Sequence, residues 1–180
     1  MNINTKEYWN KYWLEESRCP SRITAYLLNR IVNIIPEGLS VVDLGCGSGR
    51  LLRRLKETNS VYGVDISSLA MEILAVYDIK GEIGNLENFD YFNKEFDVVV
   101  LSHTLEHIDN DEALIKNIVR ITKQFAIIVV PNDCLPPKEE KTHKRVYDYD
   151  SLSALMLKYF KRCENHTLKK HLIVKCYDPM

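Results

Sequence analysis

The chain has 180 residues, of which 46% are hydrophobic and 27% are charged, as is typical of one globular domain with a sizeable core. The charges of its 24 basic and 25 acidic residues nearly cancel, so the net charge does not favour binding to a nucleic acid or to an anionic membrane. A local basic patch would still be compatible with nucleic-acid binding. The five cysteines include no CxxC pair, which indicates reduced thiols and a cytoplasmic protein. No segment approaches the roughly 20 apolar residues of a membrane span, and the amino terminus has no apolar stretch of signal-peptide length.

The amino-terminal part predicts two helices. Residues 5–14 are rich in aromatic side chains, and we expect Thr5 to cap this first helix. Residues 21–35 carry Leu27 and Ile31 at the spacing of one apolar helical face.

A strand at 40–44 begins an alternation of strands and helices. We expect Ser48 to cap the helix that follows this strand, and Ser67 and Ser68 to cap the helix after the second strand. Two continuous apolar runs, at 96–102 and 125–130, are typical of strands buried on both faces of a parallel sheet. The other expected elements are strands at 61–66 and 79–83, helices at 67–77, 109–122 and 152–160, and a hairpin of 162–168 with 171–178.

This alternation, closed by a hairpin, predicts an α/β fold. We expect an open, mostly parallel sheet with one antiparallel edge strand and helices on both faces. In such a sheet the ligand binds beyond the carboxyl ends of the strands, near the point where the strand order reverses. The stretch VVDLGCGSGR at 41–50 ends the first strand and therefore lies at that point.

The glycines of this stretch restrict the class of ligand. The P-loop pattern GxxxxGK[ST] is absent, and Arg50 stands where the dinucleotide fingerprint needs its third glycine. Asp43, at the strand end, disfavours a pyrophosphate but suits a ligand with positive groups. The glycines at 45, 47 and 49 let the backbone pass close to that ligand.

Asp65 is the second acidic residue at a predicted strand end, twenty residues after Gly45. In nucleoside-binding folds of this kind, an acid at that place accepts hydrogen bonds from the ribose hydroxyls. A ligand that combines a ribose with cationic groups and has no phosphate points to S-adenosylmethionine.

Four stretches together resemble the small class I S-adenosylmethionine-dependent methyltransferases: VVDLGCGSGR, VYGVDISSLA, FDVVVLSHTLEHI and FAIIVVPND. The resemblance implies a single Rossmann-like domain over 1–180, with an aromatic lid segment at 1–20 and an α/β core with a seven-stranded sheet at 21–180. It also implies transfer of a methyl group to an acceptor, leaving S-adenosylhomocysteine. The family often has a glycine pair before its fifth strand, where this chain has ITKQFAI.

The resemblance also assigns the cofactor contacts. Asp43 and the backbone of the glycine turn hold the methionine end, Asp65 takes the ribose, and Ile66 packs against the adenine. Asn85 is an alternative to Glu82 and Ile83 at the adenine. The full set of implied cofactor residues is Asp43, Gly45, Cys46, Gly47, Gly49, Asp65, Ile66, Glu82, Ile83, Leu101 and Ser102.

His103, Glu106 and His107 spell H-x-x-E-H, which matches a zinc-protease signature. Zinc proteases present these ligands from within a helix, whereas this motif directly follows a predicted strand, which argues against that class. The motif also resembles E-x-x-E-H of metal-dependent O-methyltransferases acting on RNA 3′ ends or in the ubiquinone pathway, with His143 as a later ligand. His103 in place of a glutamate weakens a Mg²⁺ site, although softer ions tolerate the change.

We therefore expect no metal, and we expect His103 or His107 to orient the acceptor or to act as general base. The first predicted helix has three aromatic side chains on one side, those of Tyr8, Tyr12 and Trp13. The resemblance implies that this segment folds over the cofactor. A small-molecule acceptor is the preferred interpretation.

The alternatives are a metal-assisted enzyme acting on RNA or a catechol-like acceptor, and a non-catalytic module that only binds the cofactor. Arg50 and Asp43 argue against a nicotinamide-linked oxidoreductase. The sequence leaves the acceptor and the oligomeric state open.

Overall fold

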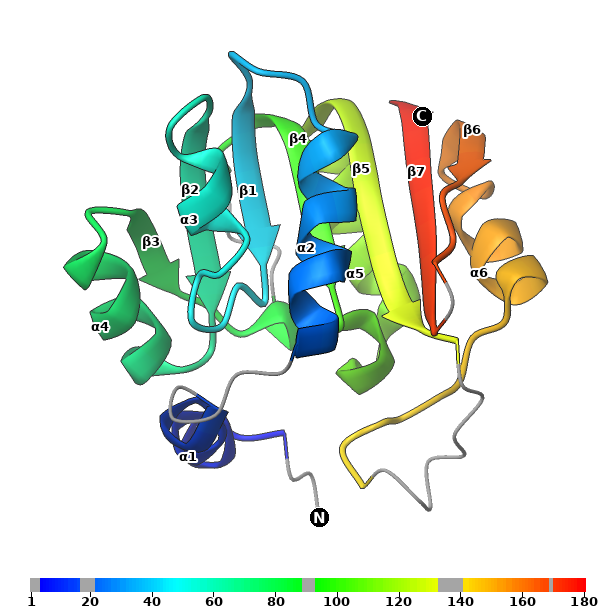
Figure 1. Ribbon diagram of the computed structural model, residues 1–180. Helices are drawn as coiled ribbons and strands as arrows, with labels where there is room; N and C mark the ends of the chain where they lie inside the picture. The colour runs from blue at the N-terminus through cyan, green and yellow to red at the C-terminus, as the bar shows by residue number, and fades with distance from the viewer. Residues whose placement is uncertain (1–3, 17–21, 89–92, 133–140, 169) are drawn as a thin grey trace.

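The computed structural model describes residues 4–16, 22–88, 93–132, 141–168 and 170–180. Cys19, Cys134 and the two ends of the predicted lid segment lie outside these residues. The described residues form one seven-stranded sheet with helices on both faces (Figure 1). The strands are β1 (Ser40–Leu44), β2 (Ser60–Asp65), β3 (Lys80–Ile83), β4 (Phe96–Ser102), β5 (Thr122–Pro131), β6 (Phe160–Asn165) and β7 (His171–Pro179).

The strand order is β3-β2-β1-β4-β5-β7-β6. The first five strands in this order pair in parallel, whereas β7 runs antiparallel to both β5 and β6. The predicted fold class is confirmed, with one difference: the antiparallel strand β7 lies one position in from the edge, because β6 occupies the edge. The order reverses between β1 and β4, so the carboxyl end of β1 lies at the switch point where ligands bind in open α/β sheets.

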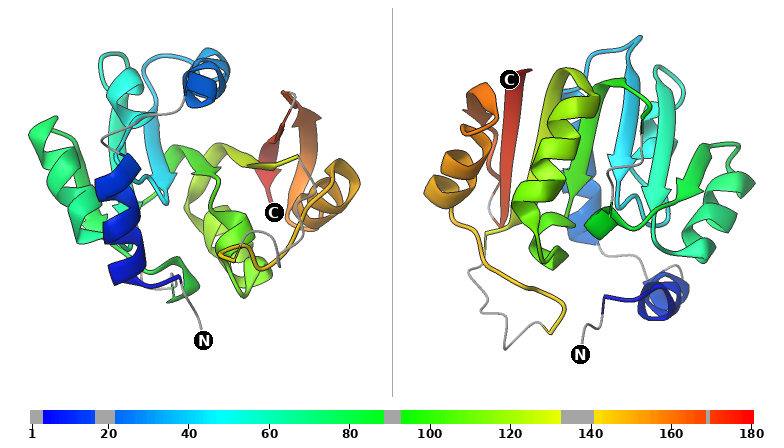
Figure 2. Two further views of the ribbon diagram at one scale, coloured as in Figure 1. Left: turned by 60° about the horizontal axis from the view of Figure 1, so that its bottom comes forward. Right: turned by 180° about the vertical axis from the view of Figure 1, so that it is seen from behind.

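The helices are α1 (Lys6–Glu16), α2 (Arg22–Asn33), α3 (Leu52–Leu55), α4 (Ser68–Val76), α5 (Asp111–Ile121) and α6 (Tyr149–Met156), with short 3₁₀ segments at Leu86–Asn88 and Leu105–His107. The helices α2 and α5 lie on opposite faces of the sheet (Figure 1 and Figure 2).

Successive residues of the central strands point to opposite faces and enter separate cores. Val41 and Val98 pack in the cluster that contains α2, whereas Val42 and Val99 pack in the cluster that contains α5 and α6. All four side chains are fully buried. This two-sided burial explains the continuous apolar runs of the sequence.

Of the predicted helix caps, Thr5 and Ser67 are confirmed, Ser48 is wrong, and Ser68 is the first residue of α4 rather than its cap. Thr5 accepts a hydrogen bond from the backbone N–H of Tyr8 at 3.3 Å, and Ser67 accepts one from Ala70 at 3.2 Å. Ser48 caps no helix, because α3 begins only at Leu52 and its cap residue makes no side-chain hydrogen bond. The glycine turn occupies the residues in between.

The aromatic helix α1 lies across the carboxyl ends of the parallel strands, apart from the two helical layers (Figure 1). It runs alongside α4 (Figure 2). The side-chain oxygen of Asn10 joins the two helices, since it accepts hydrogen bonds from the Ser67 hydroxyl at 2.5 Å and from the Leu69 backbone at 3.3 Å. Within the described ranges, no helix has both the length and the apolar character needed to cross a bilayer.

Candidate active site

The turn after β1 adopts a conformation that glycine favours. Gly45, Gly47 and Gly49 have φ angles of 78°, 51° and 68°, in the left-handed region that disfavours residues with a Cβ atom. A Cβ atom on Gly45 would overlap Thr104, and one on Gly47 would overlap the ring of Trp13. The glycines therefore let the chain turn sharply and let other groups approach the backbone.

Asp43 and Asp65 lie at the ends of the neighbouring strands β1 and β2, and both are buried. The Asp65 carboxylate accepts hydrogen bonds from the backbone N–H groups of Gly47 at 2.8 Å and Ser67 at 2.9 Å. The Oδ1 atom of Asp43 is buried and accepts no hydrogen bond from the described residues. Burial raises the pKa of both carboxyls, that of Asp43 to about 7 with a further contribution from the Asp65 charge. A cationic ligand group would stabilise the charge of Asp43.

A first cavity, with about 550 Å³ of empty space, opens beyond these strand ends. Of the predicted cofactor residues, Gly45, Asp65 and Ile66 line it. Asn85, the alternative adenine contact, also lines it. Trp9 and Trp13 of α1 also line the cavity.

The other predicted cofactor residues lie outside this lining. On β3, the Glu82 carboxylate accepts hydrogen bonds from the Tyr62 hydroxyl at 2.8 Å and from Lys94 at 2.9 Å, and the Ile83 side chain is 51% exposed. Leu101 is fully buried in the core. The turn residue Cys46 packs in a cluster with Leu52 and Leu74. The Cβ positions of Gly47 and Gly49 meet Trp13 and Leu74, respectively.

A second cavity adjoins the first, with about 700 Å³ of empty space. Ser102, another predicted cofactor residue, lines it together with Glu106 and His143, whereas Asp43 lines neither cavity. Tyr8 and Tyr12 of α1 cover one side. The residues that line both cavities are Trp9, Trp13, Gly45, His103 and His107. A ligand in one cavity would therefore lie next to a ligand in the other.

The two predicted catalytic histidines differ in what holds them. The ring of His103 contacts protein groups through both nitrogens: Nδ1 lies 3.3 Å from Glu106 Oε1, and Nε2 lies 3.0 Å from Nδ1 of His171. His107 contacts the carbonyl oxygen of Thr142 through Nδ1 at 3.1 Å. Burial lowers the pKa of His107, which favours the neutral ring.

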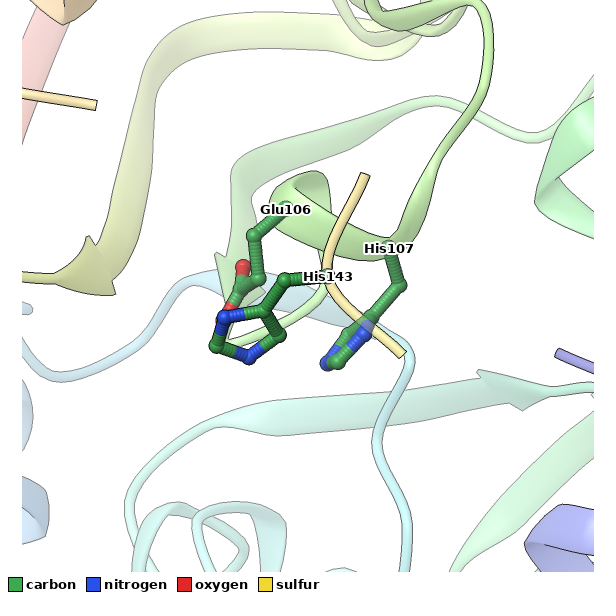
Figure 3. Close-up of side chains that lie close together, drawn as sticks. All are labelled: Glu106, His107 and His143. Atoms are coloured by element: carbon green, nitrogen blue, oxygen red, sulfur yellow. The ribbon is translucent and has the colours of Figure 1, made fainter. Parts of the chain in front are cut away.

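Glu106, His107 and His143 form a compact group (Figure 3), in which one potential ligand atom from each residue lies within 4.8 Å of the others. Glu106 is only 2% exposed, and neither of its carboxylate oxygens makes a hydrogen bond with the described residues. The motif begins at His103, directly after β4, and its other two residues lie on the 3₁₀ segment Leu105–His107, so the context differs from that of a zinc protease, as predicted. Within the described part of the chain, His103 is not a member of this group.

Sequence reasoning missed several residues of the site because they come from distant segments. Asn4 donates hydrogen bonds to the carbonyl oxygens of His107 at 2.9 Å and Thr142 at 3.1 Å. His171 reaches the site from the start of β7. The contacts from Asn4 to Thr142 and from His103 to His171 span 138 and 68 residues, and no local pattern signals them.

Residues 26–135 match the model of the family described as methionine biosynthesis protein MetW. This match extends over more than half of the chain. The chain belongs to the MetW family. It is 29% identical over 114 residues to the bifunctional methionine biosynthesis protein MetXA/MetW of Rhodopirellula baltica. The aligned part covers 57% of this chain. The matched part is only 18% of that protein. It is 47% of norajmaline N-methyltransferase of Rauvolfia serpentina and 55% of ubiquinone biosynthesis O-methyltransferase of Rickettsia bellii, which are 23% and 26% identical to this chain over 139 residues.

Solved structures show the same fold as this MetW-family chain. The putative methyltransferase bound to the Trm112 methyltransferase activator of Haloferax volcanii has a TM-score of 0.77 at 14% identity, covering 96% of this chain and 98% of that one. The magnesium protoporphyrin IX methyltransferase of Synechocystis with bound S-adenosylhomocysteine has a TM-score of 0.70 at 16% identity, covering 96% and 97%. The predicted resemblance to class I methyltransferases, with their Rossmann-like fold, is thus confirmed.

Proposed function

We propose that this chain is a methyltransferase that binds S-adenosylmethionine in the first cavity and its acceptor in the second. The proposal rests on the observation that the two cavities have five lining residues in common: Trp9, Trp13, Gly45, His103 and His107. We expect a methyl donor bound in one cavity to neighbour a nucleophile bound in the other, as in-line transfer requires. The likeness to methyltransferases supports the same cofactor.

The residues that line the first cavity fit this cofactor, and so does Asp43 on β1, which lies outside that lining. The buried, unpaired oxygen of Asp43 suits an ammonium group near the turn, and the glycines leave space for close approach to the backbone. Asp65 offers a carboxylate at the cavity for ribose hydroxyls, and Ile66 offers an apolar surface for a base. The indole N–H of Trp13 is buried without an acceptor among the described residues, so it suits a ligand oxygen.

The bound cofactor supplies a methyl group that its sulfonium already activates. The residues of the chain align the acceptor and exclude water. His107 is the better candidate for the general base, because the Thr142 carbonyl occupies Nδ1 and leaves the Nε2 lone pair for a proton from the acceptor. His103 contacts Glu106 and His171 through both nitrogens, so we assign it a positioning role.

We further propose that α1 is a lid on a single domain and that the acceptor is a small molecule. Four aromatic side chains of α1 line the second cavity, and ligand pockets for small molecules are typically lined by aromatic side chains with a few polar groups. The family description, a methionine biosynthesis protein, also favours a metabolic acceptor over a nucleic acid.

Calorimetry of the purified chain tests the proposal. S-adenosylmethionine and S-adenosylhomocysteine are expected to bind with micromolar affinity, and NAD is expected not to bind. Absence of binding by both adenosyl ligands would overturn the proposal. Cofactor binding with no methylation in a broad screen of acceptors would instead favour the non-catalytic interpretation.

A second candidate is a metal-assisted O-methyltransferase acting on RNA 3′ ends or catechol-like acceptors. The observation that favours it is the group of Glu106, His107 and His143, in which the buried Glu106 carboxylate makes no hydrogen bond with the described residues. These residues would hold a divalent ion that lowers the pKa of an acceptor hydroxyl. Two imidazoles favour Mn²⁺, Fe²⁺ or Zn²⁺ over Mg²⁺.

Calorimetry with Mn²⁺ and Zn²⁺ separates the two candidates. The metal-assisted enzyme requires binding that Glu106→Gln and His143→Ala each weaken at least about tenfold. Glu87→Gln, a carboxylate at the rim of the first cavity and outside the group, is the matched control. Equal binding by all four proteins would exclude this site.

A further inference from the structure

The strands β6 and β7 bring two thiols together at the edge of the sheet. Cys163 and Cys176 are direct partners in the antiparallel register, and their Sγ atoms lie 2.9 Å apart. Directly paired residues of antiparallel strands have Cα atoms about 4.5–5.5 Å apart. This separation falls within the range of about 4.4–6.8 Å that a disulfide needs, so the two sulfurs can bond without movement of the backbone.

We propose that Cys163 and Cys176 form a redox-active pair that exchanges with small disulfides of the glutathione class. The pair lies outside both cavities, and the proposal does not rest on the proposed methyltransferase function. Cys46, the other cysteine among the described residues, has no thiol partner there and packs against Leu52 and Leu74.

The two cysteines differ in accessibility. Cys163 is half-buried on β6, which is the edge strand, whereas Cys176 is fully buried on the inner strand β7. Contact with the Cys176 thiol lowers the pKa of Cys163, while the same contact and burial raise the pKa of Cys176. A small disulfide therefore meets Cys163 first, and Cys163 is also the better thiolate.

The exchange has two balanced steps. The Cys163 thiolate attacks one sulfur of the small disulfide, so that its S–S bond breaks, a mixed disulfide forms and one small thiolate leaves. Cys176 then loses its proton to solvent and attacks the Cys163 sulfur, which releases the second small thiolate. The two protein thiols are oxidised, the small disulfide is reduced to two thiols, and the two protons end on those thiols.

A disulfide between Cys163 and Cys176 would link the edge strand β6 covalently to β7. The two cysteines are 13 residues apart in the chain, so the link restricts the unfolded state and is expected to stabilise the fold. For a chain of this size we expect the melting temperature to rise by roughly 5 °C or more. A covalent β6–β7 hairpin is then the oxidised state of the protein.

Peptide mapping after treatment of the folded full-length chain with oxidised glutathione tests the proposal. Arg162 and Lys175 directly precede the two cysteines, so trypsin releases them on separate peptides that only a disulfide joins. We expect the joined peptide in the wild type and in Cys46→Ala, and its loss in Cys163→Ser and Cys176→Ala. The rise in melting temperature is expected only in the first two proteins and disappears with excess reduced glutathione.

Three outcomes would overturn the proposal. The first is a glutathione adduct on Cys163 that is never followed by the joined peptide. The second is pairing of either residue with Cys19 or Cys134 in the folded protein. The third is a joined peptide that leaves the melting temperature unchanged, which would mean that the link forms only after unfolding.

Discussion

The Nδ1 atom of His107 lies 3.1 Å from the carbonyl oxygen of Thr142, and this contact fixes the tautomer of the ring. A carbonyl oxygen accepts but never donates, so the neutral imidazole carries its proton on Nδ1 and keeps a lone pair on Nε2. Asn4 donates to the same carbonyl at 3.1 Å, and Trp9 packs edge-on against the ring. His107 is therefore held in one orientation, with its basic nitrogen defined.

This arrangement predicts how His107 titrates. Its pKa lies below 6.5 because burial disfavours the charged ring, so the folded state binds fewer protons than the unfolded state just below pH 6.5. The contribution of His107 to stability is thus lost as the pH falls from 6.5 through the folded pKa. NMR titration of the ring should give a pKa below 6.5 and a proton on Nδ1. A ring that titrates above 6.5 would contradict the assignment.

The raised pKa of Asp43 predicts that stability depends on pH in the opposite direction. The pKa of this carboxyl is 3.8 in the unfolded chain and about 7 in the folded protein. Between these values the folded state binds more protons than the unfolded state, so the free energy of unfolding falls as the pH rises from 3.8 to about 7. Asp43→Asn should raise the free energy of unfolding at pH 8 by up to about 4 kcal/mol, with little gain at pH 4. Guanidinium unfolding at both pH values measures this. Equal stability of the two proteins at pH 8 would refute the prediction.

Asp65 is predicted to hold the ribose of the cofactor. Asp65→Ala should weaken S-adenosylmethionine binding by roughly 10- to 150-fold, since a lost charged hydrogen bond costs about 1.5–3 kcal/mol. Because Asp65 also accepts from Gly47 and Ser67, the melting temperature must be measured beside the affinity. Glu82→Gln is the matched control, and its affinity should stay within about twofold. Retained affinity in Asp65→Ala would remove the ribose assignment.

The contact of Trp13 with Gly47 predicts a role for α1 in cofactor binding. Gly47→Ala adds a Cβ atom that overlaps the Trp13 ring, so α1 should shift, tryptophan fluorescence should move to the red, and cofactor affinity should fall by at least about fivefold. Gly38→Ala is the matched control, because Gly38 also has a left-handed φ angle, 82°, so alanine strains the backbone there as well. No atom of the described residues lies within 4 Å of the position that its Cβ would take. That control should lose stability only. Similar affinity in both variants would show that α1 does not act as a lid.

The sequence by itself determined the order of the elements and the position of the glycine turn. Apolar runs such as 96–102 belong to strands buried on both faces, and glycines at alternate positions mark a turn that bends through left-handed angles. Both signals are local, because they follow from backbone sterics and from burial of one strand. For the same reason the sequence located Asp43 and Asp65 correctly at the ends of adjacent strands.

Only the tertiary structure decided which side chains meet. Asn85 rather than Glu82 faces the first cavity, because the chain bends into it only after β3 ends. Pairing of β6 with β7 set Cys163 against Cys176, and it placed β6 rather than β7 at the edge. Thr142 meets His107, and His171 meets His103, across long stretches of chain. Such contacts depend on how strands and loops are arranged in space, and the spacing of residues along the chain does not specify them.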